Sequence, residues 1–333
     1  MKKIFFLILA AICFFFVACE QKEKKYVFDG LVQGTYYHII IYSKDTAQIQ
    51  QGFDSIFALV DNTFSLWNKN SLLTKLNNNE QVKLNQIFVD NFNRAKQINA
   101  LTDGALDITI GAIVQAYGFA NKEKQEINKR VIDSLKTFIG MDNVTIKDNE
   151  LIKTYKETQL DFNAIAQGYT TDMISDFLTK RGVENFLIDV GGEVYCKGEK
   201  PNGKSWSVAI ETPTDEAKNE RSYKTLVKLK DKSIVTSGNY RKFYVENGVK
   251  YSHTIDPKTA QSVKHNLLSA SAIADNATMA DGLATAFMVM GLEKSKEFLA
   301  KHKEFAAYLI YSDEKGDMKV WQSDNFAAYL NND

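Results

Sequence analysis

The residues best suited to chemistry lie in one segment, Leu160–Glu193, which reads LDFNAIAQGYTTDMISDFLTKRGVENFLIDVGGE. The pattern predicts a short strand that ends at Asp161, a turn of small residues and an amphipathic helix over 169–180. A buried strand follows over 186–190 and ends in the sequence DVGGE. Paired glycines let a backbone approach another group closely, and buried carboxylates are costly unless they meet a ligand or a hydrogen-bond donor. We therefore expect this segment to form part of a functional site.

A second set of oxygen donors opens a predicted helix over 278–290. Asp281 and Thr285 are one turn apart, so they lie on one face of that helix. A carboxylate and a hydroxyl suit a hard cation such as Mg²⁺, which takes few protein ligands when phosphate oxygens are available. Taken alone, the pair equally fits a helix start with a solvated aspartate and a threonine bonded to its own backbone.

Three further polar segments offer hydroxyl, amide or charged groups, although each by itself is more often a turn or a surface loop. They are DGALDITIG (103–111), TSGNYR (236–241) and HTIDP (253–257). The last contains His253, one of four histidines in the chain. The sequence has no P-loop, no Rossmann glycine pattern, no HExxH and no CxxC, which disfavours the sites that those motifs build.

The elements that must position these residues alternate between strands and helices with hairpin-like spacing. We expect an α+β fold with an antiparallel-rich mixed sheet or sheets and packed helices. A polar loop over 65–71 contains Trp67, and a tight bend at Gln33-Gly34 interrupts a strand region over 27–42. The other predicted strands are 206–211, 225–230, 233–236, 242–246, 269–274, 307–311 and 319–322, and the other predicted helices are 46–64, 85–101, 122–138 and 292–301.

The N-terminus has the features of an export signal. Lys2 and Lys3 precede an apolar run too short for a comfortable membrane span, and the run ends in Val-Ala-Cys, as at a bacterial lipoprotein processing site. We predict a signal peptide over 1–18, a lipidated Cys19, a polar tether over 19–25 and a domain over 26–333. The protein would then be anchored in a membrane of the bacterial cell envelope, facing the periplasm or the exterior. Ordinary secretion with cleavage near Ala18 is the alternative.

The composition argues against nucleic-acid binding and against sites built from cysteine pairs. The chain has 41 basic and 41 acidic residues, so its charge does not favour binding to nucleic acid. Its three cysteines are Cys13, Cys19 and Cys196. Because Cys13 leaves with the signal and Cys19 is the predicted anchor, the mature domain has no pair of cysteines for a disulfide or a cysteine-based metal site.

Read together, eight segments in this order resemble the FAD:protein FMN transferase family (ApbE type), and the resemblance extends from about Val27 to Trp321. Many members of that family are secreted lipoproteins, in agreement with the N-terminus. The segments are Gly34-Thr35, SLWNKNSLLTKLN (65–77), DGALDITIG, LDFNAIAQGYTTD (160–172), IDVGGE (188–193), TSGNYR, HTIDP and ADGLATA (280–286).

The resemblance implies a role for each of these positions. Asp281, Thr285 and the backbone carbonyl of Ala164 would hold Mg²⁺. The residues implied to contact FAD are Gln33, Trp67, Ala105, Leu106, Asp107, Asp161, Gln167, Thr254 and Ile255. A serine or threonine hydroxyl of an acceptor flavoprotein would attack the FMN-side phosphorus of FAD, and AMP would leave.

The base that would deprotonate the acceptor hydroxyl is less defined. His253 is our candidate because a histidine is suited to base work near neutral pH. Asp161 or Asp256 could serve instead, because a nearby Mg²⁺ lowers the pKa of the acceptor and so reduces the need for a strong base.

Three positions depart from the family pattern. Gln33 replaces the usual methionine, and Gln167 replaces the usual lysine or glutamate. Ala260 replaces the glycine that ends an Asp-Pro-x-Thr-Gly turn, where a positive φ is costly for alanine. These changes affect contacts to the flavin nucleotide and leave the implied metal ligands intact.

Two other functions use the same features. A Mg²⁺-dependent FAD pyrophosphatase would give FMN and AMP by using water as the nucleophile. A non-catalytic lipoprotein that binds flavin is the third interpretation, but a pure binder has no need for Asp281 and Thr285 at one-turn spacing beside a pyrophosphate.

Overall fold

The computed structural model describes residues 23–119, 127–213, 223–238, 243–246, 249–252 and 254–330. Cys19 and the predicted signal peptide lie outside these residues. The first strand, β1, begins at Lys24, inside the predicted tether and ahead of the predicted domain start at residue 26. Within the described ranges, no helix is both long and apolar enough to cross a membrane.

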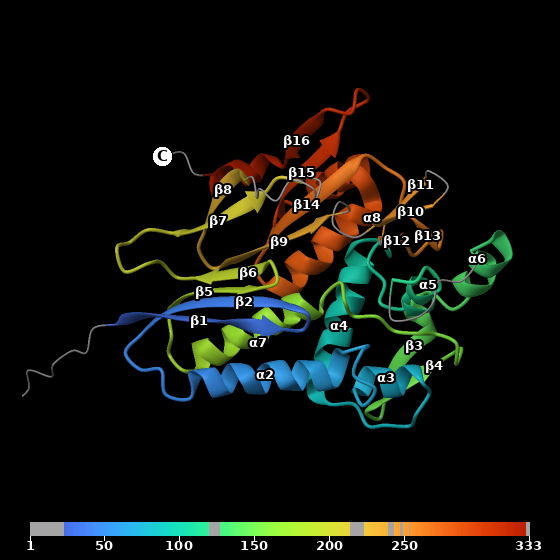
Figure 1. Cartoon of the computed structure of the whole chain (residues 1–333), viewed down its shortest axis with the longest axis horizontal. Coiled ribbons are helices and arrows are strands. Elements are labelled where there is room, and N and C mark those ends of the chain that lie inside the picture. Colours follow the sequence, from blue (N-terminus) through green and yellow to red (C-terminus); the bar gives the residue numbers. More distant parts are fainter. Residues whose placement is uncertain are drawn as a thin grey trace, which may run out of the picture.

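One eight-stranded sheet organises the molecule, and every neighbouring pair of its strands is antiparallel (Figure 1). Its order is β1-β2-β5-β6-β9-β14-β15-β16. Alternation along the strands decides which side chains are covered: in β5, Phe186, Ile188 and Val190 are buried on the face that meets helices. The strands are β1 Lys24–Val32, β2 Thr35–Ser43, β5 Asn185–Val190, β6 Glu193–Lys197, β9 Lys232–Gly238, β14 Leu267–Ala274, β15 Ala306–Ser312 and β16 Met318–Gln322.

Three helices cover one face of this sheet (Figure 1). Helices α2 (Ile49–Phe64) and α7 (Ala166–Lys180) pack on β2 and β5, and α8 (Ala277–Lys301) packs on β14 and β15. The opposite face is covered by the hairpin of β7 (Trp206–Glu211) and β8 (Tyr223–Leu229), together with the short helix η3 (Asp324–Tyr329). Both faces of the central strands are therefore buried.

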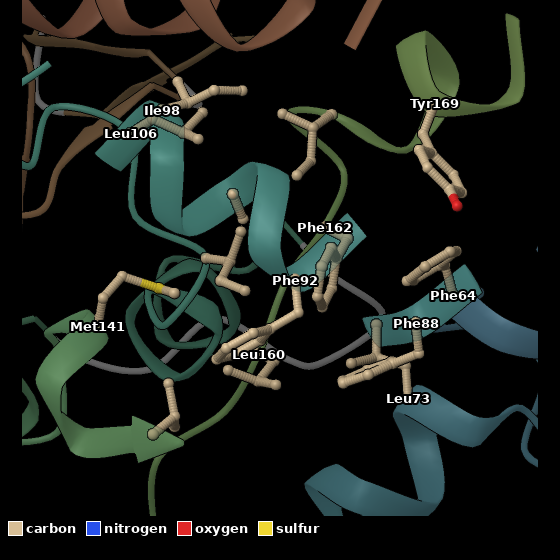
Figure 2. Packing of buried hydrophobic residues seen from close by; sticks show 14 of the residues in the cluster. Phe64, Leu73, Phe88, Phe92, Ile98, Leu106, Met141, Leu160, Phe162 and Tyr169 are labelled. Carbon is tan, nitrogen blue, oxygen red and sulfur yellow. The ribbon is translucent and has the colours of Figure 1, made fainter. Parts of the chain in front are cut away.

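A helical lobe beside the sheet has its own core (Figure 2). Phe64, Phe88 and Phe162 form a cluster of rings whose centroids lie 4.9 to 6.1 Å apart. The remaining elements are α3 Leu72–Asn77, α4 Gln86–Leu101, α5 Gly111–Ala116, α6 Lys129–Lys136, η2 Met141–Asn143, β3 Val144–Lys147, β4 Glu150–Lys153, β10 Phe243–Glu246, β11 Val249–Ser252, β12 Ile255–Asp256 and β13 Gln261–Ser262.

The predicted α+β class is confirmed, and so are the helices whose apolar residues recur with helical spacing. The expected bend at Gln33-Gly34 is the two-residue turn between β1 and β2, with φ values of 53° and 74°. Helices α2 and α4 match the predictions over 46–64 and 85–101 within three residues. Gly291, with φ 75° and ψ −179°, breaks α8 at the point that separates the two predicted helices. Part of the predicted helix over 122–138 lies outside the described residues, and α6 falls within the rest.

The predicted strand ending at Asp161 is wrong. Gln159 forms a single bridge to Ile110, and no ladder continues from it within the described chain. The physical reason is that the side-chain amide of Asn77 satisfies the backbone of Leu160, since Nδ2 donates to the Leu160 carbonyl (2.9 Å) and Oδ1 accepts from its N–H (2.8 Å). The helix that follows also begins three residues earlier than expected, at Ala166.

Candidate active site at the first turns of α7 and α8

The first turn of α8 is capped from two directions. Asn276 is its own N-cap and accepts a hydrogen bond from Met279 N at 2.9 Å. Asp172, from the middle of α7, accepts from Ala277 N (2.7 Å), Thr278 N (3.1 Å) and Thr278 Oγ1 (2.5 Å). The N–H groups at a helix start have no partner within the helix, so these two side chains satisfy the exposed donors of α8.

The first turn of α7 is capped in return by α8. The N-cap residue Ile165 has no side-chain acceptor, and Gly168 N instead donates to Asp281 Oδ2 at 3.1 Å. A Cβ added at Gly168 would lie 2.5 Å from the Ala277 carbonyl oxygen and 2.8 Å from Asp281 Cβ. Glycine is therefore required at position 168, because any side chain would separate the two helix starts.

Asp281 is the least compensated carboxylate at this junction. The residue is 5% exposed, and no cation pairs with its carboxylate among the described residues. Burial raises its pKa well above the usual value, the Gly168 N–H opposes this, and the nearby carboxylate of Asp172 raises it further. A buried carboxylate with so few donors is costly unless a cation or a proton joins it.

The donors around Asp281 fit a magnesium ion. Thr285 follows one turn later, and its half-buried hydroxyl lies 3.3 Å from Ser237 Oγ at the end of β9. Ala164 precedes Gly168 in the turn that leads into α7. The described residues contain no cluster of three or more His, Cys, Asp or Glu arranged to hold a metal ion. A metal here would rely on one carboxylate plus hydroxyl and carbonyl oxygens, the hard donors that Mg²⁺ accepts.

Asp107 and Asp161 lie on adjoining segments. Asp161 N donates to the Ile108 carbonyl at 2.7 Å, and Gly111 N donates to the Gln159 carbonyl at 3.0 Å. Asp107 accepts from Thr109 N (2.8 Å) and Thr109 Oγ1 (2.5 Å), while Asp161 accepts from Asn163 N (2.8 Å). Burial raises the pKa of both carboxyl groups, and these local hydrogen bonds partly offset the shift.

Asp107 also lines a pocket of about 320 Å³. An ion pair between Lys258 and Asp103 lies at this pocket, with Nζ 2.5 Å from Oδ2, and it lowers the pKa of Asp103. The other lining residues are Asn99, Gly104, Lys136, Ile139, Gly140, Met141, Asp142 and Pro257. A second pocket of about 410 Å³, lined by residues such as Lys44 and Arg181, contains no predicted site residue.

The two glutamines that depart from the family pattern both adjoin the start of α7. Gln33 Nε2 donates to Thr170 Oγ1 at 3.4 Å, while the Thr170 hydroxyl donates to the Ala166 carbonyl at 2.8 Å. Gln33 Oε1 is buried and has no hydrogen-bond partner within the described ranges. Gln167 Nε2 would lie 2.8 Å from a Cβ at Gly191, so the first glycine of DVGGE is needed for this close approach.

The carboxylate of DVGGE in β5 finds its donors within the fold. Asp189 Oδ1 accepts from Gly192 N at 2.9 Å, and Oδ2 accepts from Tyr36 Oη at 3.2 Å. This aspartate closes the turn that brings Gly191 to Gln167, so its role is to shape the site from outside.

The remaining predicted residues divide by exposure. Trp67 is 58% exposed, so its ring does not pack into the edge of the hydrophobic core. Ala105 and Leu106 are buried in the helical lobe. Thr254 and Ile255 are also buried, and Ile255 packs with Ala260. Ala260 adopts φ 53° although it is not glycine. His253 lies outside the described residues.

Sequence reasoning missed Asp172. It ends the quoted segment LDFNAIAQGYTTD, yet its partners Ala277 and Thr278 are more than 100 residues away in the chain. No local pattern reveals such a cap, because a carboxylate on a helix usually faces solvent.

Comparison with known proteins gives consistent matches over nearly the whole chain. A family model described as the ApbE family matches residues 33–309. The FAD:protein FMN transferase of Haemophilus influenzae is 32% identical over 334 residues, covering 95% of this chain and 95% of that protein. The protein of the same name from Vibrio cholerae is 30% identical over 321 residues, covering 94% and 95%.

Solved structures agree with these matches. The flavin transferase ApbE from Vibrio cholerae superposes with a TM-score of 0.82 at 28% identity, covering 92% of this chain and all of that one. The flavinyl transferase ApbE from Pseudomonas stutzeri, in its apo form, gives a TM-score of 0.83 at 27% identity, covering 93% and 98%.

Gly168→Ala tests the close approach of the two helices. Alanine favours a helix interior over glycine by about 1 kcal/mol, but here its methyl group would strike the Ala277 carbonyl. We expect a net loss of about 1–3 kcal/mol in the free energy of unfolding, measured by urea titration, as for an overpacked site. A variant as stable as the wild type, or more stable, would show that the helix starts can separate freely.

Proposed function

The chain belongs to the ApbE family, and from this membership we propose that it transfers FMN from FAD to a serine or threonine hydroxyl of an acceptor flavoprotein, with release of AMP. The membership confirms the resemblance found in eight short segments of the sequence. The observation that carries the proposal is the buried carboxylate of Asp281, which has no cationic partner among the described residues and lies one turn from Thr285.

We propose that Asp281, Thr285 and the Ala164 carbonyl hold Mg²⁺. These three residues flank the contact of α7 with α8, and all three offer oxygen. When bound there, Mg²⁺ would neutralise charge on the FAD pyrophosphate. A non-catalytic flavin binder would gain nothing from leaving Asp281 buried without a cation, which favours a catalytic role.

The reaction is a substitution at phosphorus. The acceptor hydroxyl oxygen forms a bond to the FMN-side phosphorus, the bond from that phosphorus to the bridging oxygen breaks, and AMP leaves with the electron pair. The acceptor proton passes to a base. We keep His253 as the candidate for this base and Asp161 or Asp256 as the alternatives. Burial raises the pKa of Asp161, and a carboxylate with a raised pKa is a stronger base.

FAD would extend from this junction across the adjoining segments. Asp161 and the loop of Ala105, Leu106 and Asp107 are joined by backbone hydrogen bonds, and Asp107 reaches the 320 Å³ pocket. Trp67 would stack on the flavin from its exposed loop. The other proposed contacts are Gln33, Gln167, Thr254 and Ile255.

We further propose that the mature protein is a lipoprotein of the bacterial cell envelope. The support is the apolar run that ends in Val17-Ala18-Cys19 and the polar residues after it. The folded domain begins at Lys24, so only a short tether would separate it from a lipid on Cys19.

Asp281→Ala tests the metal and the reaction together. The purified chain is incubated with FAD, Mg²⁺ and a candidate acceptor subunit, and the mass of the acceptor is measured. Wild type should add the mass of FMN less water and release AMP. Loss of the charged ligand should slow transfer on the order of 10²-fold or more. Thr285→Val should show a smaller defect, because it removes one neutral oxygen.

Full transfer by Asp281→Ala, or by wild type in excess EDTA, would rule out the Mg²⁺ assignment. Release of FMN and AMP with no change in acceptor mass, across all candidate acceptors, would favour the pyrophosphatase alternative.

Trp67→Ala tests contact with the flavin. Trp67 is largely exposed, so its removal should leave the urea unfolding midpoint unchanged. Loss of a stacked ring should raise the FAD dissociation constant about 10-fold or more, and Trp67→Phe should recover much of the affinity. Equal affinity in the three proteins, measured by fluorescence titration, would leave Trp67 with no role in binding.

Cys19→Ser tests the anchor. Wild type grown with labelled palmitate should carry the label and sediment with membranes, and the variant should do neither. A variant that keeps both the label and the membrane association would contradict lipidation at Cys19.

A further inference from the structure

Asp172 lies where three helices meet. It comes from α7, it accepts three hydrogen bonds from Ala277 and Thr278 at the start of α8, and its Oδ2 is 3.3 Å from Nη1 of Arg94 on α4. The residue is buried, with 8% of its surface exposed. The Arg94 guanidinium also lies over the Tyr169 ring, 5.5 Å from its centroid, so it is held in place from both sides.

This arrangement exceeds what a simple helix cap requires. α8 already has its own N-cap in Asn276, which binds Met279 N. Asp172 adds a second acceptor from a different helix, so one side chain joins α7 directly to the first turn of α8. A buried polar contact of this kind between two helices is expected where it fixes the geometry of a functional site.

The geometry links Asp172 to the proposed metal ligands. Ala164 precedes α7, whereas Asp281 and Thr285 are on α8, so the ligand set depends on how the two helices are placed relative to each other. Two polar contacts set that placement: Asp172 with the first turn of α8, and Asp281 with Gly168 of α7. Asp281 is itself a proposed ligand, which leaves Asp172 as the contact that holds the helices independently of the metal.

We propose that Asp172 is a positioning residue, which holds the first turn of α8 against α7 and thereby places Asp281 and Thr285 to bind the divalent cation. The inference rests on the proposed function for the identity of the cation. Asp172 would not bind the cation itself and would act on the ligands through its contact with α8. Thr278 and Arg94 would support this role, because both bind the Asp172 carboxylate.

Asp172→Asn is the principal test. Asparagine keeps the shape, but its NH₂ group must face the N–H of Ala277 or the donors of Thr278, so one contact with α8 becomes repulsive. The full-length chain, loaded with FAD, is titrated with Mg²⁺ alone by calorimetry. We expect the Mg²⁺ dissociation constant to rise 10- to 100-fold, as when a residue supporting a metal ligand is lost. Saturating Mg²⁺ should restore most of the transfer rate.

The control and the graded variants separate positioning from general stability. Asp176→Asn makes the same charge change one turn later on α7, at an exposed position, and should bind Mg²⁺ like wild type. Thr278→Val removes only the hydroxyl that donates to Asp172 and should weaken Mg²⁺ binding a few-fold, whereas Thr278→Ser should restore it. If Asp172→Asn does not fold, the comparison of Thr278→Val with Thr278→Ser still distinguishes a positioning role from a purely structural one.

The inference would be overturned if Asp172→Asn bound Mg²⁺ as tightly as wild type while its melting temperature fell. Wild-type Mg²⁺ affinity in Thr278→Val would overturn it as well. Asp172 would then be a structural cap only. In that case Asp281→Ala would still lose Mg²⁺, and the proposed function would stand. If wild type itself binds no Mg²⁺ and transfers FMN in EDTA, the proposed metal fails and the inference fails with it.

Discussion

The contact between the first turns of α7 and α8 is the constraint on which the rest of the site depends. Each helix caps the other: Asp172 of α7 accepts from the N–H groups of Ala277 and Thr278, and Asp281 of α8 accepts from Gly168 N. The approach is so close that only glycine fits at position 168. The sheet and the helical lobe pack on the two helices from outside, and the reciprocal caps join the two helix starts directly.

Electrostatics follow from the same contact. The N-terminal ends of two helices carry partial positive charge, and they meet at a point where two carboxylates are buried. Arg94 compensates Asp172, whereas Asp281 has only the Gly168 N–H and the end of α7. Asp281 is therefore the less compensated of the two carboxylates, and a bound cation would stabilise its charged form. A site of this kind trades stability of the metal-free protein for affinity towards a cation.

Local patterns predict what depends on local forces. The apolar run over 186–190 predicted β5, and the spacing of Asp281 and Thr285 placed both on one face of α8. The sequence could not reveal the role of Asp172, because its partners are brought close only by the packing of α7 on α8. The same limit explains the strand wrongly predicted to end at Asp161. The backbone N–H and C=O of Leu160 bond to the side chain of Asn77, which is distant in the sequence, and not to a neighbouring strand.

A ligand set with a single carboxylate also couples the two molecules that the proposed site would bind. Asp281, Thr285 and a backbone carbonyl supply fewer and weaker donors than a cage of several carboxylates, and Mg²⁺ completes such sets with phosphate oxygens. In the proposed site those oxygens come from the FAD pyrophosphate. Mg²⁺ and FAD must then each raise the affinity for the other by the same factor, because binding free energies are reciprocal. The site beside Asp281 would thus be occupied by Mg²⁺ most fully when the substrate is present.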